Sequence, residues 1–268
     1  MPDFLATAVE IARAAGALLL PYYDRRIRVE YKGDVDIVTE ADRASEALIT
    51  ERLRVRFPDH GILAEEGGGR ESDSPYRWYI DPLDGTTNFA HGFPFFCVSM
   101  GLEKSGEPLI GVVYDPLRDE LFTAEKGTGA MLNNRRIRVS GVAALSEALV
   151  ATGFPTRKRH KNANIHFYHQ LTMRTHGVRR AGSAALDMCY VGCGRLDAFW
   201  EFNLNPWDVA AATLIVREAG GRVTDMRGGA HSVTSDTVLA TNGLIHPDML
   251  QVFAEVFQGR YASPLPQV

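Results

Sequence analysis

The sequence predicts a mixed fold, with an α+β first half and an α/β second half, and three observations carry this prediction. The 268 residues are 45% hydrophobic and 23% charged, which is ordinary for a globular protein. In the first half, short aromatic and β-branched runs alternate with Gly, Pro and Asp, as in antiparallel strands. In the second half, short apolar runs alternate with helical patterns. We divide the chain into residues 1–142 and 143–268, which we expect to form one functional unit.

The chain opens with a predicted amphipathic helix over residues 4–23. Its apolar side chains keep helical spacing, and Glu10 and Arg13 interrupt the apolar run. A membrane span needs about 18 consecutive apolar residues, and this run is shorter. No signal-peptide cleavage pattern follows it. We therefore expect a cytoplasmic protein with no membrane partner. Three cysteines, an odd number without zinc-type pairing, also fit a reducing compartment and are expected to be core thiols.

A second helix is predicted over residues 39–56. Thr39 is its expected N-cap, and Asp42 stands three residues later, where it can complete a capping box. Phe57 and Pro58 end the helix. An antiparallel meander is then expected, with strands at residues 78–80, 94–104, 109–114 and 120–125.

In the second half, strands are expected at residues 148–152 and 196–202, and helices at residues 164–175, 183–191 and 206–219. Asn205 is the expected N-cap of the last of these helices, and Pro206 its first residue. His166 and His169 lie three residues apart without an acid or cysteine to complete a zinc site, so we expect a surface or packing role.

The charge of the chain argues against nucleic acid as a partner, because the net charge is −4 and the pI is about 6.1. One basic run, residues 157–161, is the exception. A solvated loop is the favoured interpretation. Together with Arg174, Arg179 and Arg180, the run could instead receive a second substrate phosphate or meet RNA or a protein.

Acidic residues follow an apolar strand at Asp81 and Asp84. Pro82 favours an extended conformation for the residue before it, so the two carboxylates can converge at the end of the strand. Hard oxygen ligands of this kind suit Mg²⁺. If Gly85 and Thr86 open a helix, their amides would favour a phosphate. The alternative for Asp84 is a helix cap without a metal.

Two further acids strengthen the metal interpretation. Glu65 follows the apolar residues 62–64, and Asp208 stands in the first turn of the helix that Asn205 caps. The positive end of that helix is expected to keep Asp208 ionised. Three acidic strand-to-helix corners thus predict one convergent Mg²⁺ site. The glycines at 67–69 are either a mobile loop beside this site or a surface turn.

These motifs, in this order and over nearly the whole chain, resemble the inositol monophosphatase family of lithium-sensitive, Mg²⁺-dependent phosphatases. The matching stretches are Asp36-Ile37-Val38-Thr39-Glu40-Ala41-Asp42, Ala64-Glu65-Glu66, Asp81-Pro82-Leu83-Asp84-Gly85-Thr86-Thr87-Asn88-Phe89, Gly182-Ser183-Ala184-Ala185 and Pro206-Trp207-Asp208-Val209-Ala210, followed by Glu218-Ala219-Gly220-Gly221. The resemblance implies a layered αβαβα sandwich of the inositol monophosphatase and fructose-1,6-bisphosphatase type, usually as a homodimer.

The resemblance also implies roles for individual residues. A first metal would be held by Glu65, Asp81 and the carbonyl of Leu83, and a second by Asp81, Asp84 and Asp208. A third, weaker Mg²⁺ would sit near Glu65, with Lys32 in the corresponding loop. Thr86, hydrogen-bonded to Asp42, would orient and activate the attacking water, and the amides of Gly85 and Thr86 would hold the phosphate. Substrate hydroxyls would meet Asp84, Ser183, Ala184, Glu201 and Asp208.

The predicted reaction is hydrolysis of a small phosphate monoester, inositol 1-phosphate in the first place. Fructose 1,6-bisphosphate, histidinol phosphate and an adenosine bisphosphate are the alternative substrates, and binding in an RNA or transcription complex is the non-enzymatic alternative. The metal ligands identify the reaction class rather than the substrate, because every member of such a family binds the same phosphoryl group but not the same alcohol. Glu201 could also be a surface acid at a strand end.

Overall fold

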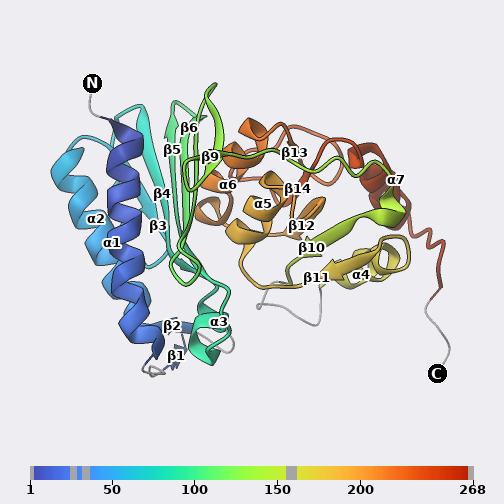
Figure 1. The fold of residues 1–268 in the computed structure, drawn as a ribbon, viewed down its shortest axis with the longest axis horizontal. Helices are drawn as coiled ribbons and strands as arrows, with labels where there is room; N and C mark the ends of the chain where they lie inside the picture. Colours follow the sequence, from blue (N-terminus) through green and yellow to red (C-terminus); the bar gives the residue numbers. More distant parts are fainter. Residues whose placement is uncertain (1–2, 25–28, 32–36, 155–161, 265–268) are drawn as a thin grey trace.

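The computed structural model describes residues 3–24, 29–31, 37–154 and 162–264, with backbone alone for 29–31 and 37–38. Five layers alternate in the order helix, sheet, helix, sheet, helix (Figure 1). The outer helices of the first half are α1 (Phe4–Asp24) and α2 (Glu40–Arg56); α5 (Ala184–Gly192) and α6 (Pro206–Glu218) lie between the sheets; α4 (Asn164–Thr172) and α7 (His246–Phe257) cover the second sheet. The predicted αβαβα sandwich is confirmed.

The first sheet has the strand order β3-β4-β5-β6-β7-β8-β9 and is antiparallel except for the parallel pair β3 and β4. Its strands are β3 (Gly61–Ala64), β4 (Tyr76–Asp84), β5 (Cys97–Lys104), β6 (Glu107–Asp115), β7 (Glu120–Glu125), β8 (Gly129–Leu132) and β9 (Arg135–Arg136). The predicted meander is therefore confirmed from β4 to β7. Strand β5 starts at Cys97 rather than residue 94, because the preceding residues turn back, with Phe95 N donating to Phe93 O.

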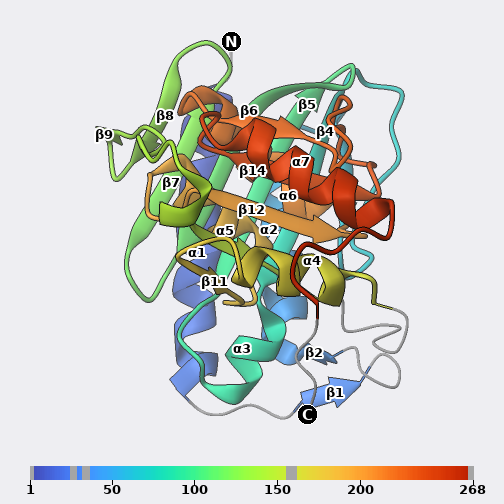
Figure 2. The same cartoon turned by 90° about the vertical axis from the view of Figure 1, so that its right-hand side faces the viewer.

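The second sheet has the order β11-β10-β12-β14-β13. Its strands are β10 (Leu149–Thr152), β11 (Gly177–Arg179), β12 (Ala198–Phe202), β13 (Arg222–Thr224) and β14 (Thr237–Thr241). Strand β10 is parallel to β11 and β12, whereas β14 is antiparallel to both of its neighbours. A 3₁₀ turn, η1 (Leu145–Glu147), leads into β10, and a separate antiparallel pair, β1 (Val29–Tyr31) and β2 (Ile37–Thr39), lies before α2. Figure 2 shows α4 and α7 over this second sheet.

Three hydrophobic cores fill the spaces between the layers. One joins α1 and α2 to the first sheet, one surrounds α5 and α6 between the sheets, and one lies between the second sheet and the helices α4 and α7. Helix α6 approaches the first sheet so closely that a Cβ at Gly101 would lie 2.7 Å from the Ala210 side chain. The predicted division after residue 142 falls between the two sheets, yet α6 packs across it. The division into residues 1–142 and 143–268, as halves of one functional unit, stays a prediction.

Helix α1 is long and apolar enough to cross a membrane by length and composition alone. In the structure, one face of α1 contributes Ile11, Ala15 and Leu19 to the core shared with α2 and the first sheet. The opposite face carries polar residues, such as Arg13, which pairs with Asp119 across 2.7 Å. Packing in the core therefore accounts for the apolar composition, and the amphipathic helix predicted for residues 4–23 is confirmed.

Candidate active site

Strand β4 is irregular at the point where it carries Asp81 and Asp84. Asp81 pairs with Ser99 of β5, and Asp84 pairs with Cys97. Between these two pairs, β4 contains one residue more than β5. Such an extra residue is a β-bulge. In a regular strand, residues three apart point to opposite faces. The bulge instead allows both carboxylates to turn toward one cluster. Pro82 lies within it, where its missing N–H costs no ladder hydrogen bond.

Four acids interact electrostatically around the end of β4: Glu65, Asp81, Asp84 and Asp208. Burial raises the pKa of Asp81 well above its ordinary value, and the carboxylates of Glu65, Asp84 and Asp208 raise it further. Asp81 is only 2% exposed, so water screens this repulsion poorly. The structure therefore brings together all four acids that the sequence singled out, from the turn after β3, from β4 and from α6. Buried acids that repel one another are characteristic of functional sites.

The N-terminus of α5 holds the carboxylate of Asp84. Its Oδ2 accepts hydrogen bonds from Ser183 Oγ and from the amide of Ala185, each 2.7 Å long. These bonds and the amide of Ala184 lower the pKa of Asp84, but burial raises it more. Ser183 is also the N-cap of α5, where its hydroxyl accepts from the amide of Leu186. Ser183 thus orients Asp84, a function that sequence reasoning did not assign to it.

Asp208 lies in the first turn of α6, as predicted. Asn205 is the N-cap, Pro206 is the first helical residue, and Asp208 completes a capping box by accepting from the Asn205 amide across 2.7 Å. The expectation that the helix end keeps Asp208 ionised stays a prediction, because other groups act on Asp208 as well. Burial, followed by the charge of Asp84, raises the pKa of Asp208 to about 8, and the bonds from Asn205 oppose this only in part.

Thr86 and Asp42 contact each other directly. Thr86 Oγ1 lies 3.0 Å from Asp42 Oδ1 and 3.0 Å from the Leu83 carbonyl oxygen, so its one proton has two alternative acceptors. The other oxygen of Asp42 accepts from the amide of Thr39, which confirms the predicted capping box of α2. Burial raises the pKa of Asp42, although the bonds from Thr39 and Thr86 lower it.

Gly85 and Thr86 begin the short helix α3 (Thr86–His91), so the predicted helix opening is confirmed. Gly85 has a φ of 98°, and a Cβ there would lie 2.9 Å from the Phe95 carbonyl oxygen. Only glycine fits this turn without strain.

The corner at Glu65 differs from the prediction. Strand β3 ends at Ala64, and a turn follows rather than a helix. The prediction of a strand-to-helix corner at Glu65 is therefore wrong. The turn is held by Glu46 of α2, whose carboxylate accepts from the amides of Glu66 and Gly68 across 2.6 and 2.7 Å. The sequence signal for Glu46 was its position four residues after Asp42, on the same buried helix face. Residues 67–69 follow this turn directly, and both interpretations of them, a mobile loop or a surface turn, stay predictions.

The residues fit a hard divalent cation by their chemistry. All donors are oxygens, and a cation would relieve the repulsion that raises the pKa of Asp81. Within the described ranges, no three acidic, histidine or cysteine side chains are already arranged around one cation position. The hydrogen bonds from Ser183, Ala185 and Asn205 engage Oδ2 of Asp84 or Asp208, so Oδ1 of each could bind a cation while these bonds hold the carboxylate in place.

Glu201 lies on β12 and is 8% exposed, so the interpretation as a surface acid is wrong. Burial raises its pKa to about 8, and the nearby Asp84 contributes to that rise. Ala184, the first residue of α5, is also buried beside Asp84. The predicted substrate contacts thus come from four places in the fold: the end of β4, the start of α5, β12 and the first turn of α6. They are Asp84, Ser183, Ala184, Glu201 and Asp208.

The remaining polar candidates lie elsewhere. Arg174 forms an ion pair with Glu255 of α7 across 2.7 Å, and it therefore does not face the acidic cluster around Asp81. His169 contacts the Ser263 carbonyl and His166 packs on Tyr261, as expected for packing roles. Cys97 and Cys189 are buried thiols, but Cys193 is only half-buried, because it follows the end of α5. Lys32 and the basic run at residues 157–161 lie outside the described residues.

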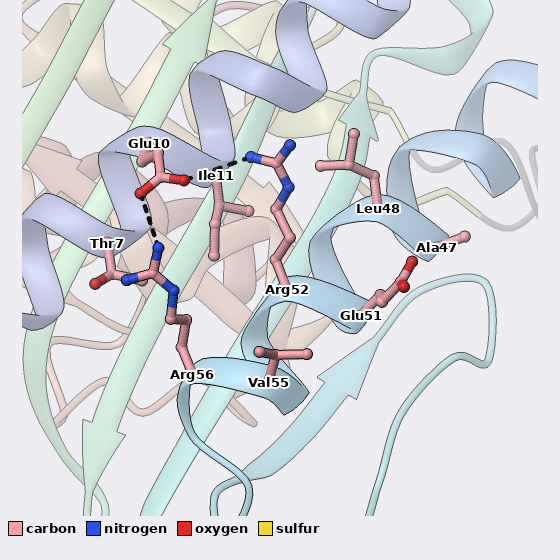
Figure 3. A pocket seen from close by; sticks show the side chains of 9 residues that line it. All are labelled: Thr7, Glu10, Ile11, Ala47, Leu48, Glu51, Arg52, Val55 and Arg56. Carbon is pink, nitrogen blue, oxygen red and sulfur yellow. Dashed lines mark hydrogen bonds and ion pairs between the residues drawn. The ribbon is translucent and has the colours of Figure 1, made fainter.

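A surface groove of about 540 Å³ separates α1 from the second half of α2 (Figure 3). On its rim, Glu10 lies 3.6 Å from Arg52 and 3.5 Å from Arg56. Val55 on α2 is part of the lining. None of the candidate site residues lines this groove, which is therefore separate from the acidic cluster.

Comparisons with known proteins agree with this geometry. The model of the inositol monophosphatase family matches residues 1–259. An inositol-1-monophosphatase of Synechocystis is 48% identical over 257 residues, which cover 95% of this chain and 90% of that protein. The Nus factor SuhB of Pseudomonas aeruginosa is 46% identical over 90% of this chain and 92% of its own. The solved structure of an inositol monophosphatase from Anabaena superposes with a TM-score of 0.86 at 46% identity, covering 94% and 95% of the two chains.

Proposed function

Because the chain belongs to the inositol monophosphatase family and is a phosphoric monoester hydrolase of that type, we propose that it hydrolyses inositol 1-phosphate to inositol and phosphate with Mg²⁺. The observation that carries the proposal is the convergence of Glu65, Asp84 and Asp208 on the buried Asp81, close enough for their charges to raise its pKa. A bound cation would offset the repulsion among these carboxylates.

Two Mg²⁺ ions would be held by Glu65, Asp81, the Leu83 carbonyl, Asp84 and Asp208, with a third, weaker ion near Glu65. When bound, Mg²⁺ supplies positive charge that stabilises the attacking and leaving oxygens and the phosphoryl group between them. The hydrogen bond from Ser183 to Asp84 supports this assignment, because it holds one carboxylate oxygen in place. Ligands that are fixed before binding lose little freedom when the cation arrives.

The attacking water is oriented by Thr86. When Thr86 donates its proton to Asp42, its oxygen lone pairs remain to accept a hydrogen bond from the water. Burial makes Asp42 a stronger base than an exposed aspartate, because its pKa is raised. The water proton therefore has a path toward the carboxylate through the threonine hydroxyl.

The phosphate would lie against the amides of Gly85 and Thr86 at the start of α3, and the missing side chain of Gly85 lets this turn pack against Phe95 and Phe96. The alcohol would face the opposite side of the cluster, where Asp84, Ser183, Ala184, Glu201 and Asp208 offer mostly acceptors to its hydroxyl groups. As the ester bond breaks, the alcohol oxygen leaves as an alkoxide and takes a proton from solvent.

A bisphosphate, such as fructose 1,6-bisphosphate, is a weaker candidate, as are histidinol phosphate and an adenosine bisphosphate. The ion pair between Arg174 and Glu255 removes one arginine that a second phosphate would need. A binding role in a transcription complex is a second candidate function, favoured by the 46% identity to a protein named Nus factor SuhB. A homodimer and a cytoplasmic location are further proposals; the three free cysteines are compatible with the latter.

Initial rates of phosphate release from inositol 1-phosphate and fructose 1,6-bisphosphate test the proposal, each with Mg²⁺ and with a chelator. We expect release that depends on Mg²⁺ and prefers inositol 1-phosphate. Preference for the bisphosphate would move the function to sugar phosphates. No release from either substrate would contradict the proposal and direct attention to the binding role.

A further inference from the structure

Helix α2 carries two buried polar side chains, Ser45 and Glu46, that are not among the proposed metal ligands or substrate contacts. Ser45 is fully buried and Glu46 is 4% exposed. Both lie three or four residues after Asp42, and residues at this spacing share one face of a helix. The same face of α2 therefore carries the contact from Asp42 to Thr86 and these two side chains.

Glu46 holds the backbone beside Glu65. Its Oε2 accepts from the amide of Glu66 across 2.6 Å, and its Oε1 accepts from the amide of Gly68 across 2.7 Å. On the other side, the amide of Glu65 itself donates to the Ile80 carbonyl of β4 across 3.3 Å. The peptide groups before and after Glu65 are thus both hydrogen-bonded, one to β4 and the other to α2.

Ser45 holds the backbone within the bulge of β4. Its hydroxyl donates to the Pro82 carbonyl across 2.9 Å, and the amide of the same peptide group, that of Leu83, donates to Asp81 Oδ1 across 2.9 Å. Both polar ends of this peptide group are therefore fixed. Because a peptide group is planar, its fixed orientation limits the direction of the Leu83 carbonyl that follows. That carbonyl also lies 3.0 Å from Thr86 Oγ1.

These contacts converge on one set of proposed ligands. Glu65, Asp81 and the Leu83 carbonyl are the groups proposed for the first Mg²⁺, and Ser45 and Glu46 bond to peptide groups next to them. Groups that orient metal ligands from behind typically change metal affinity or activity by about 10- to 100-fold when they are removed. Adjacent residues of one helix are thus placed to control the geometry of the first Mg²⁺ site.

We propose that Ser45 and Glu46 are positioning residues of the first Mg²⁺ site: they hold the backbone that carries Glu65 and the Leu83 carbonyl, and they thereby raise the affinity of the site for the cation. The inference rests on the proposed function, because it concerns ligands that this function assigns. Ligands that are held in place before binding lose little freedom when the cation arrives. Loss of either contact should therefore weaken Mg²⁺ binding more than it slows the reaction once Mg²⁺ is bound.

The test compares Glu46→Gln and Ser45→Ala with the unchanged enzyme. Glutamine has the size of glutamate but a single acceptor oxygen, so it cannot accept from both amides. Calorimetric titration with Mg²⁺, without substrate, measures the dissociation constant. Phosphate release from inositol 1-phosphate at increasing Mg²⁺ measures the half-saturating concentration. We expect each variant to raise both values about tenfold, and the rate at saturating Mg²⁺ to stay within about threefold of the original.

Glu103→Gln and Thr50→Val are the matched controls. Glu103 is a buried glutamate near the other end of β5, where it accepts from the Tyr79 hydroxyl across 2.9 Å. Thr50 carries a buried hydroxyl of α2 that donates to the Glu46 carbonyl within the helix, across 2.8 Å. Both variants should lower stability and leave the Mg²⁺ affinity unchanged. Thermal unfolding verifies that each protein is folded, and Ser45→Ala, which removes one oxygen, tests the inference even if Glu46→Gln does not fold.

Unchanged Mg²⁺ affinity in the folded variants, with a loss of stability alone, would assign Ser45 and Glu46 a structural role and overturn the inference. A large loss of rate at saturating Mg²⁺ with an unchanged dissociation constant would also overturn it. If the unchanged enzyme binds and requires Mg²⁺ but the variants match it, the inference fails and the proposed function stands. If the unchanged enzyme neither binds Mg²⁺ nor releases phosphate, the proposed function fails first.

Discussion

The Ser183 hydroxyl donates a 2.7 Å hydrogen bond to Asp84 and so links the start of α5 to the end of β4. The two residues are 99 positions apart and come from the two halves of the chain. Asp84 also accepts from the Ala185 amide, so the orientation of one proposed metal ligand depends on a helix in the other half. This link explains why neither half is expected to form a working site by itself.

Ser183→Ala removes both the bond to Asp84 and the N-cap of α5. We expect kcat/KM for phosphate release to fall about tenfold or more, since a bond to a charged group contributes about 1.5–3 kcal/mol. The free energy of unfolding should fall by about 1 kcal/mol through loss of the cap. Ser183→Thr keeps the hydroxyl and is expected to restore most of the activity. Unchanged activity in Ser183→Ala would mean that the α5 amides alone orient Asp84.

Thr86→Ala removes the group that orients the attacking water. We expect kcat to fall about 10²–10⁴-fold with KM little changed, as for the loss of a group that acts in proton transfer. Thr86→Ser should retain much of the rate because it preserves the hydroxyl near Asp42. Steady-state rates at saturating Mg²⁺ measure the effect. A full rate in Thr86→Ala would remove the threonine from the reaction.

Gly85→Ala places a Cβ 2.9 Å from the Phe95 carbonyl at a φ of 98°. We expect a loss of stability of about 1–3 kcal/mol and a large loss of turnover, because the amides at residues 85 and 86 would shift. Gly92→Ala is the matched control, with a φ of 70° but no atom within 4 Å of the added Cβ. It should cost some stability and leave turnover unchanged. Equal turnover in the two variants would argue against phosphate binding at Gly85.

The stability of the metal-free protein should depend on pH through Glu201. Burial raises its pKa to about 8 from an ordinary 4.5, so the folded protein keeps a proton that the unfolded chain loses. This contribution to stability is fully present below pH 4.5 and is lost as the pH rises through about 8. In chelator, the unfolding free energy should therefore decline less steeply over this range in Glu201→Gln than in the unchanged protein.

Urea unfolding at several pH values measures this slope. The exposed Glu71, which pairs with Arg77 on the surface, offers the control Glu71→Gln, expected to keep the original slope. Identical slopes for Glu201→Gln and the unchanged protein would show that the carboxyl group of Glu201 titrates normally in the folded state.

Local rules predicted much of the fold. Helices α2 and α6 begin where their caps, Thr39 and Asn205, stand in the sequence. The strands β4 to β7 follow the alternation of apolar runs and turn residues. No helix or strand is predicted beyond residue 219, so β13, β14 and α7 come from the structure alone, and short strands such as β9 carry too few residues for a periodic pattern.

The site was predicted by residue type more than by geometry. The bulge between Asp81 and Asp84 depends on pairing with β5, which alternation along one strand does not reveal. The environment of Asp208 could not be predicted from the helix-end rule, which is local, whereas burial among other acids is a property of the folded chain.

The central claim is that the acids around Asp81 bind Mg²⁺ for phosphate release, and the most direct test is the Mg²⁺ dependence of the initial rate in the unchanged enzyme and in Asp84→Asn. The variant should fold, because its amide oxygen can accept the bonds from Ser183 and Ala185 and one buried charge is removed. We expect a saturable dependence on Mg²⁺ in the unchanged enzyme and a rate at least about 10³-fold lower in the variant at saturating Mg²⁺. Phosphate release at the original rate in Asp84→Asn would contradict the account.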